Sequence, residues 1–295
     1  DVERSRGLGD VYKRQHFPLP DNFFDDHQGM GTAAREAEML VSKHMGLSND
    51  NKIDPEIVKE TGHNPFLKWY PRAYYANLDR MTPEQRESWD KVYKAVNEVF
   101  RVNTPEGDSL ARWKYQRYME DYLACIRSVD DNVGRILDYL KESGLDKNTI
   151  VVYTSDQGFY LGEHGWFDKR FMYEESFRTP LLIRYPRMIK PGSQNNDLVQ
   201  NIDFAPTFLE LAGLDIPEDI QGMSIVPLLK GEEPVNRRRA LYYHYYEYPG
   251  IHMAKCHYGI RTDRYKLIHF YNDIDEWELY DLEKDPHEMH NVIND

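Results

Sequence analysis

The longest regular pattern in the chain is helical. Across residues 110–143, apolar side chains recur at steps of three and four residues, which places them on one face of an α-helix. Gly144 follows directly, and glycine is well suited to end a helix. The pattern predicts one long amphipathic helix, with an apolar stripe of Tyr118, Tyr122, Ile126, Val129, Val133, Ile136, Leu137 and Leu140.

Two short apolar runs follow this predicted helix. Residues 150–153 (Ile-Val-Val-Tyr) and 180–185 (Pro-Leu-Leu-Ile-Arg-Tyr) are each bounded by turn residues, which is typical of buried strands. A long helix that leads through a short loop into an apolar strand is a repeating unit of parallel α/β sheets. We therefore expect residues 150–153 to form a strand of such a sheet and residues 180–185 to close the unit.

Shorter signals lie on both sides of this unit. Residues 82–85 (Thr-Pro-Glu-Gln) combine an N-cap threonine, a proline in the first helical position and a glutamine at the third, which predicts a helix start. A second short helix is expected over residues 203–211, with Asp203 as a candidate cap and Gly213 after its end. Residues 237–239 are three arginines, which we interpret as exposed charges.

The pattern changes after Ala240. Four β-prone, aromatic-rich segments, separated by turn residues, predict an antiparallel meander over residues 241–248, 258–261, 265–271 and 277–282. We therefore divide the chain into an α/β part over residues 16–236 and a small C-terminal antiparallel subdomain over residues 237–295. Residues 1–15 are polar and unpatterned and resemble a non-native tail.

Composition fits a folded α/β protein and excludes several functions. The 295 residues are 40% hydrophobic, which is enough for a real core. Lys plus Arg number 37 against 50 Asp plus Glu, a net charge of −13, which argues against a general nucleic-acid or anionic-membrane binder. Two cysteines cannot make a disulfide scaffold. No apolar run approaches the roughly 20 residues that a membrane-spanning helix needs.

The candidate chemistry begins where the first predicted strand ends. Residues 155–158 (Ser-Asp-Gln-Gly) form a turn that carries the carboxylate of Asp156 and the amide of Gln157. Open α/β sheets bind their ligands beyond the carboxyl ends of their strands. Hard oxygen donors of this kind suit Ca²⁺ or Mg²⁺, although calcium takes about six to eight oxygens. A simple turn cap is an equally good interpretation of Asp156.

Further ionisable residues follow in the next dozen positions. Lys169 is placed to meet an anionic group that also touches the metal, because lysine acts as a compact point charge on phosphate or sulfate oxygens. A cation plus a lysine stabilises charge on transferring oxygens. Asp168 and Arg170 could bracket sugar hydroxyls or form a surface ion pair. His164 could donate a proton or hold the turn, and we favour the structural role.

These residues carry a family resemblance. The motifs resemble the second signature of the formylglycine-dependent sulfatases, in the alkaline phosphatase superfamily, and residues 19–26 are similar to a segment of bacterial polysaccharide sulfatases of the N-acetylglucosamine-6-sulfatase or heparan sulfatase type. The matching segments are residues 154–158, 162–165, 169, 178–181, 203–207, 211–213, 221–224 and 280–286.

The resemblance implies a fold and a set of roles. The fold would be part of an alkaline-phosphatase-like sandwich, a mostly parallel sheet flanked by helices. The family pattern makes Asp156 and Gln157 ligands of one calcium ion, and it makes Lys169 the residue that grips the sulfate. The remaining implied residues contact the sulfated carbohydrate substrate: Asp168, Arg170, His257 and His164.

The family mechanism implies attack of a hydrated formylglycine on sulfur, expulsion of the alcohol and release of sulfate. Formylglycine arises from Cys or Ser in a Cys/Ser-x-Pro-x-Arg motif, and neither Cys125 nor Cys256 lies in one. We therefore expect that the nucleophile and the remaining calcium ligands belong to a preceding part, and that this chain alone neither hydrolyses sulfate esters nor binds calcium tightly. The family also implies a periplasmic or extracellular parent protein.

Two other functions remain open at this point. A phosphate or phosphonate ester hydrolase of the same superfamily usually needs a richer His/Asp set for two transition metals, so an Asp-Gln pair with one lysine fits a single calcium better. A non-catalytic carbohydrate-binding pseudo-sulfatase would explain the missing nucleophile and the aromatic C-terminal region. The Cys/Ser-x-Pro-x-Arg motif upstream, intact or degenerate, distinguishes the enzyme from the binding protein.

Overall fold

The computed structural model describes residues 16–65 and 73–295; the predicted tail lies outside the described residues. None of the described helices is long and apolar enough to cross a membrane. The α-helices of this part are α2 (Thr32–Glu36), α3 (Pro55–Glu60), α4 (Ala73–Asp79), α5 (Pro83–Val102), α6 (Gly107–Glu142), α7 (Glu174–Phe177), α8 (Phe204–Leu211) and α9 (Val226–Lys230). The strands are β1 (Val151–Thr154), β2 (Tyr160–Leu161), β3 (Phe167–Asp168), β4 (Leu181–Arg184), β5 (Leu241–Tyr245), β6 (His257–Arg261), β7 (Tyr265–Phe270) and β8 (Glu276–Asp281).

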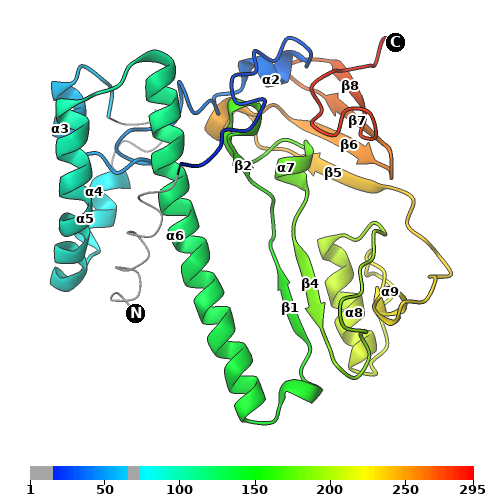
Figure 1. Cartoon of the computed structure of the whole chain (residues 1–295). Coiled ribbons are helices and arrows are strands. Elements are labelled where there is room, and N and C mark those ends of the chain that lie inside the picture. Colours follow the sequence, from blue (N-terminus) through cyan, green and yellow to red (C-terminus); the bar gives the residue numbers. More distant parts are fainter. Residues whose placement is uncertain (1–15, 66–72) are drawn as a thin grey trace.

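The predicted long helix is confirmed as α6, and its two halves differ. Tyr115 and Met119, in the N-terminal half, pack with Phe23 and Phe167 in a buried cluster. The C-terminal half reaches away from that cluster (Figure 1). Part of the predicted stripe is therefore exposed, contrary to expectation, because no described element covers it there: Ile126 (42% exposed), Val129 (45%) and Ile136 (58%).

The two predicted strands that follow α6 are confirmed as β1 and β4, but they pair antiparallel, with Val152 opposite Ile183. The expectation of parallel pairing is thus wrong for these two strands. The physical reason is the connection: the chain returns to β4 through residues 155–180, which form β2, β3 and α7, whereas a parallel return needs a crossover helix that packs on the sheet. Leu182 of β4 is 65% exposed.

The capping predictions have mixed outcomes. Thr82 caps α5 in a capping box with Gln85, as predicted. Helix α8 is also confirmed, and Asp203 occupies its N-cap position, but the Asp203 side chain makes no capping hydrogen bond. The carboxylate of Asp203 is fully buried and accepts two hydrogen bonds from Arg238, one of them 2.7 Å long. Arg238 is therefore a structural partner, and only its neighbours Arg237 and Arg239 are exposed.

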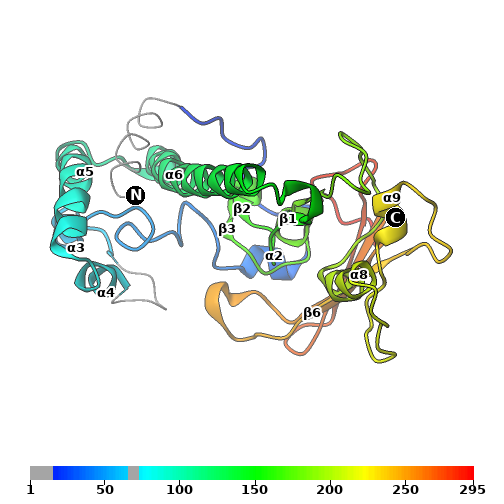
Figure 2. The ribbon, with the colours of Figure 1, turned by 90° about the horizontal axis from the view of Figure 1, so that it is seen from below.

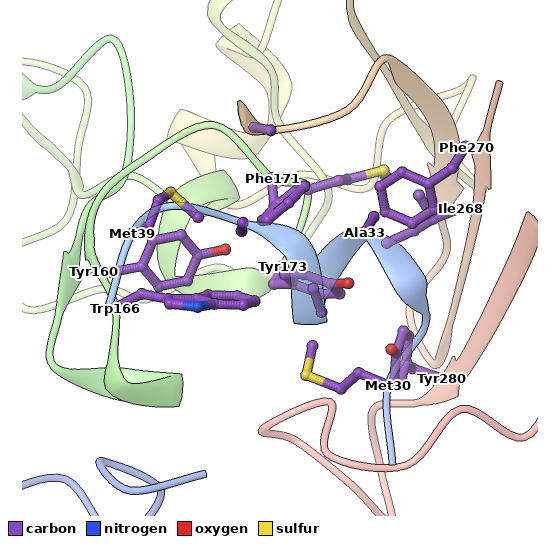
Figure 3. Close-up of a cluster of buried hydrophobic side chains, with 14 residues drawn as sticks. Met30, Ala33, Met39, Tyr160, Trp166, Phe171, Tyr173, Ile268, Phe270 and Tyr280 are labelled. Atoms are coloured by element: carbon purple, nitrogen blue, oxygen red, sulfur yellow. The ribbon is translucent and has the colours of Figure 1, made fainter. Parts of the chain in front are cut away.

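The predicted C-terminal meander is confirmed as one antiparallel sheet, ordered β5-β6-β7-β8. Its inner face packs against α2 and the segment around β2 and β3, as Figures 2 and 3 show. The subdomain boundary near residue 236 stays a prediction, because the sheet shares its core with the rest of the chain. The shared core includes Met39, Tyr160, Trp166, Phe171 and Tyr173 together with Ile268, Phe270 and Tyr280 of the sheet.

A buried ionic cluster fixes the sheet to α7. Lys266 of β7 is fully buried, and its ammonium lies 2.9 Å from Glu174 and 2.8 Å from Glu288. Burial raises the pKa of Glu288 to about 7, although Lys266 opposes the shift. Loss of one partner of a buried ion pair leaves an uncompensated charge and costs about 3–5 kcal/mol. The cluster therefore holds α7 firmly against the sheet.

His164 occupies a second buried ionic cluster. Its side chain is fully buried, with Nδ1 3.8 Å from Asp25 and Nε2 3.7 Å from Glu175. These separations are ion-pair distances, longer than hydrogen bonds. Burial alone would lower the pKa of His164, but the two carboxylates outweigh it and raise the pKa to about 9. The favoured structural role of this histidine agrees with its position.

This cluster predicts a pH dependence of stability. A group whose folded pKa is raised stabilises fully below its unfolded pKa and loses that contribution as pH rises through the folded pKa. His164, shifted from 6.5 to about 9, should therefore add up to ~3 kcal/mol to the free energy of unfolding at pH 6, and this should vanish by pH 10.

Denaturant unfolding of the wild type and the His164→Gln variant from pH 6 to 10 tests this. Lys114, whose pKa burial lowers to about 8, titrates in the same range with the opposite sign, so the difference between the two proteins is the quantity to follow. A difference that is independent of pH contradicts the assignment.

Candidate active site

The predicted metal-binding turn, residues 155–158, packs directly against α7. The backbone N–H of Gly158 donates to the Ser176 carbonyl at 3.0 Å, and that of Phe159 donates to the Glu175 carbonyl at 2.7 Å. A Cβ atom at position 158 would lie 2.3 Å from the Glu175 oxygen. Only glycine permits this approach, so the turn is seated on α7 by backbone contact.

The side chains of Asp156 and Gln157, both in this turn, lie in different environments. Asp156 is exposed, and its backbone carbonyl accepts a hydrogen bond from Asn201 at 3.1 Å. The Gln157 amide nitrogen donates to the Ser176 carbonyl and, at 3.3 Å, to its hydroxyl. The side-chain oxygen Oε1 of Gln157 accepts no hydrogen bond within the described residues, whereas its backbone carbonyl accepts one from the Ser155 hydroxyl at 2.9 Å. The amide is thus anchored by its nitrogen, which leaves an oxygen for a ligand.

These two residues fit a calcium site in kind but not in number. A carboxylate oxygen and an amide oxygen are the donors that calcium prefers, and about six to eight are needed. Among residues 16–65 and 73–295, no group of three or more His, Cys, Asp or Glu side chains is arranged to hold a metal. Asp156 and Gln157 can therefore supply only part of such a site.

Lys169 lies in a strained segment close to this turn. Its side chain is partly buried, and its ammonium makes no hydrogen bond or ion pair with any residue that the structure describes. Both neighbours have left-handed backbone conformations, with φ of 72° at Asp168 and 134° at Arg170. Such conformations are costly for residues other than glycine and concentrate at functional sites. The ammonium is thus available for an anion.

Asp168 and Arg170 form the predicted charged pair, and a third residue joins them. Arg170 donates to Oδ1 of Asp168 at 3.0 Å, and Nε2 of His252 lies 3.0 Å from Oδ2. Burial raises the pKa of Asp168, but the hydrogen bond to His252 and the charge of Arg170 outweigh it, so the net shift is downward. Asp168 is therefore held as an oriented carboxylate.

Ser176 of α7 connects this pair to the metal-binding turn. The Ser176 hydroxyl accepts the backbone N–H of Arg170 at 2.9 Å and the amide N–H of Gln157 at 3.3 Å. The hydroxyl of Tyr243, on β5, donates to the Arg170 carbonyl at 2.9 Å. Two segments thus meet at Ser176, Tyr243 holds one of them in place, and Lys169 lies between Asp168 and Arg170 along the chain.

Two predicted substrate-binding residues are placed away from any surface. His257 is fully buried, with Nδ1 2.8 Å from the Lys255 carbonyl, and burial lowers its pKa to about 4. His164 is also fully buried. Contact of either ring with the substrate stays a prediction.

The imidazole beside Asp168 is instead that of His252, which our sequence analysis missed. Its one sequence signal is its position after Pro249-Gly250, in a turn between aromatic strands.

Comparisons with known proteins match this chain to sulfatases. The family model "Sulfatase" matches residues 58–214, and the model "N-sulphoglucosamine sulphohydrolase, C-terminal" matches residues 162–295. An N-acetylglucosamine-6-O-sulfatase of Bacteroides thetaiotaomicron is 50% identical over 292 residues, which cover 98% of this chain and 50% of the relative. An arylsulfatase of Clostridium perfringens is 32% identical, over 81% of this chain and 50% of its own length. The chain spans about half the length of these curated relatives.

Solved structures confirm the alkaline-phosphatase-like fold class. One is a protein in complex with its substrate, D-glucosamine-2-N,6-O-disulfate, which matches with a TM-score of 0.88 at 50% identity, over 98% of this chain and 57% of that one. A phosphonate monoester hydrolase of Agrobacterium radiobacter matches with a TM-score of 0.55 at 30% identity, over 63% of this chain and 38% of that one. Because the sulfatase model matches more than half of the 295 residues, the protein belongs to the sulfatase family.

Proposed function

We propose that this chain forms the sulfate- and sugar-binding half of a sulfatase that acts on a sulfated amino sugar. The observation that carries the proposal is the convergence at Ser176. There the amide of Gln157 and the backbone of Arg170 are fixed together, and the chain between them presents the uncommitted ammonium of Lys169. Two oxygen ligands would hold a calcium ion, and this ion and the lysine would contact one tetrahedral anion. This arrangement suits sulfate ester hydrolysis.

Each residue has a proposed role. Asp156 and Gln157 would provide two of the oxygen ligands of a calcium ion, which polarises a sulfate oxygen when bound. Lys169 contacts another sulfate oxygen and stabilises the negative charge that develops on it. Asp168, oriented by Arg170 and His252, accepts a hydrogen bond from a sugar hydroxyl. The attacking group is formylglycine in this family, and the motif from which it forms does not occur in the sequence of this chain.

The substrate class is proposed from the relatives. One 50% identical relative is named for 6-O-sulfated N-acetylglucosamine, and one solved structure holds a doubly sulfated glucosamine. A phosphonate monoester hydrolase is the second candidate, because such an enzyme shares the fold at 30% identity. We favour the sulfated sugar, since the identity to the sulfatase is higher and extends over nearly the whole chain.

Lys169 provides the first test. In the protein that carries this chain together with an intact formylglycine motif, Lys169→Ala should lower kcat/KM for glucosamine 6-sulfate by about 10²- to 10³-fold, because one charge-stabilising group is lost. Lys147→Ala, at an exposed lysine within the short 3₁₀-helix η1 (Asp146–Asn148), serves as the control and should stay at the wild-type rate. Wild-type turnover by the Lys169 variant, or no sulfate release by the unmodified protein, contradicts the proposal.

Calcium binding provides the second test. Asp156→Asn in that longer protein should weaken Ca²⁺ binding by about 10- to 100-fold, because a charged oxygen ligand becomes neutral. Isothermal titration with CaCl₂ measures the affinity directly and needs no turnover. Asp138→Asn, at an exposed carboxylate of α6, is the matched control. Equal calcium affinities of the two variants would show that Asp156 is not a ligand.

A further inference from the structure

Helix α7 presents hydrogen-bond acceptors to the turn at residues 155–158. The last carbonyl groups of a helix have no N–H partner within the helix. In α7, the Glu175 carbonyl accepts the Phe159 N–H at 2.7 Å, and the Ser176 carbonyl accepts the Gly158 N–H at 3.0 Å. Ser176 is fully buried, so its polar groups need partners from the protein itself.

The side-chain amide of Gln157 supplies the other donors at Ser176. Its nitrogen donates to the Ser176 carbonyl and, at 3.3 Å, to the Ser176 hydroxyl. Together with the Gly158 N–H, the carbonyl therefore accepts two hydrogen bonds, which uses both of its lone pairs. A carbonyl oxygen cannot donate, so this contact fixes which end of the amide faces Ser176. The nitrogen faces the helix, and Oε1 is left for another partner.

Tyr243 of β5 supports the same orientation. Its hydroxyl donates to the Arg170 carbonyl at 2.9 Å, which uses the only proton of the phenol. The Gln157 side chain also forms a hydrogen bond with this hydroxyl, and the amide nitrogen must be the donor because the phenol oxygen can then only accept. Two separate elements, α7 and β5, therefore present acceptors to the Gln157 amide.

Helix α7 is itself fixed by a residue from the C-terminal segment. The Tyr173 side chain, at the N-cap position, makes no capping hydrogen bond. Instead, one carboxylate oxygen of Glu288 accepts the Glu174 N–H at 2.7 Å, and the other lies 2.8 Å from buried Lys266. A cap of this kind satisfies one of the unpaired N–H groups at the helix start. Ser176 therefore has a defined position before any ligand binds.

We propose that Ser176 is a positioning residue that selects an amide over a carboxylate at position 157 and so leaves Oε1 of Gln157 for the calcium ion. The inference rests on the proposed function and adds the residue through which Gln157 acts. A glutamate at position 157 has two acceptor oxygens and no N–H donor. Its carboxylate could accept from the Ser176 hydroxyl, but one oxygen would face the Ser176 carbonyl, which would lose a buried donor.

The Gln157→Glu substitution tests this, because two effects predict opposite signs. A charged ligand in place of a neutral one normally strengthens calcium binding. Here the repulsion between the carboxylate and the Ser176 carbonyl should outweigh that gain and weaken Ca²⁺ binding by about tenfold. Isothermal titration with CaCl₂ measures the affinity in the longer protein that carries this chain and an intact formylglycine motif. An affinity equal to or above that of the unmodified protein overturns the inference.

A double-mutant comparison separates positioning from a purely structural role. Ser176→Ala removes the hydroxyl and should weaken Ca²⁺ binding by about threefold to tenfold. In a Gln157→Ala background the same substitution should change the affinity by less than about twofold, because no amide is left to position. In an Asp156→Asn background the full effect should remain. Effects of equal size in both backgrounds indicate a structural role and reject the proposal.

Two controls accompany these measurements. Gln194→Glu makes the same charge change at an exposed glutamine of the loop after β4, and Ser193→Ala removes an exposed hydroxyl beside it. Neither should alter the calcium affinity. Glutamate and glutamine have nearly the same shape, so Gln157→Glu decides the question even where Ser176→Ala fails to fold.

Failure of the proposed function has a different signature. In that case the unmodified longer protein binds no calcium or releases no sulfate from glucosamine 6-sulfate. Calcium binding that Asp156→Asn weakens and Gln157→Glu does not weaken rejects only the role of Ser176.

Discussion

Three consecutive residues of the short helix α7 hold the candidate site together. Glu174 pairs with buried Lys266 of the C-terminal sheet, Glu175 lies 3.7 Å from the ring of His164, and Ser176 binds Gln157 and Arg170. A four-residue helix has no stability of its own. Its position depends on these buried charges and on the backbone contact that Gly158 allows. The C-terminal sheet, the aromatic core and the candidate site are thus packed together through α7.

This arrangement explains which features could be predicted from the sequence. The helices and strands with strong periodicity, such as α6 and the four C-terminal strands, appear where the pattern placed them, because each is decided by its own residues. The direction in which β1 and β4 pair is decided by the connection between them. Burial of the α6 stripe likewise depends on what covers it, and neither property is encoded in local spacing.

The histidines show the same limit at the site. His257 and His252 are five positions apart in an aromatic-rich segment. The family resemblance selected His257, which lies in a strand, as the substrate-binding residue. In the structure the strand histidine turns into the core, whereas His252 sits in a turn with φ of 66° that directs its ring to Asp168. Asp50 and Lys114 meet at a cavity although they are 64 positions apart. Their proximity comes from tertiary packing, so no single segment could reveal it.

The net charge of −13 and an anionic substrate are compatible for a related reason. Charges farther apart than a Debye length, about 8 Å at physiological ionic strength, are largely screened. A sulfate bound near Lys169 therefore responds to the groups around it. There, Arg170 is already matched by Asp168, while the ammonium of Lys169 has no partner among the described residues. The long-range field slows the approach of a polyanion, but the local balance decides whether one sulfate stays. Under the proposed function, such a site would favour a short sulfated sugar, whose charge is concentrated where the lysine can reach it, over a long polyanion that the rest of the surface repels.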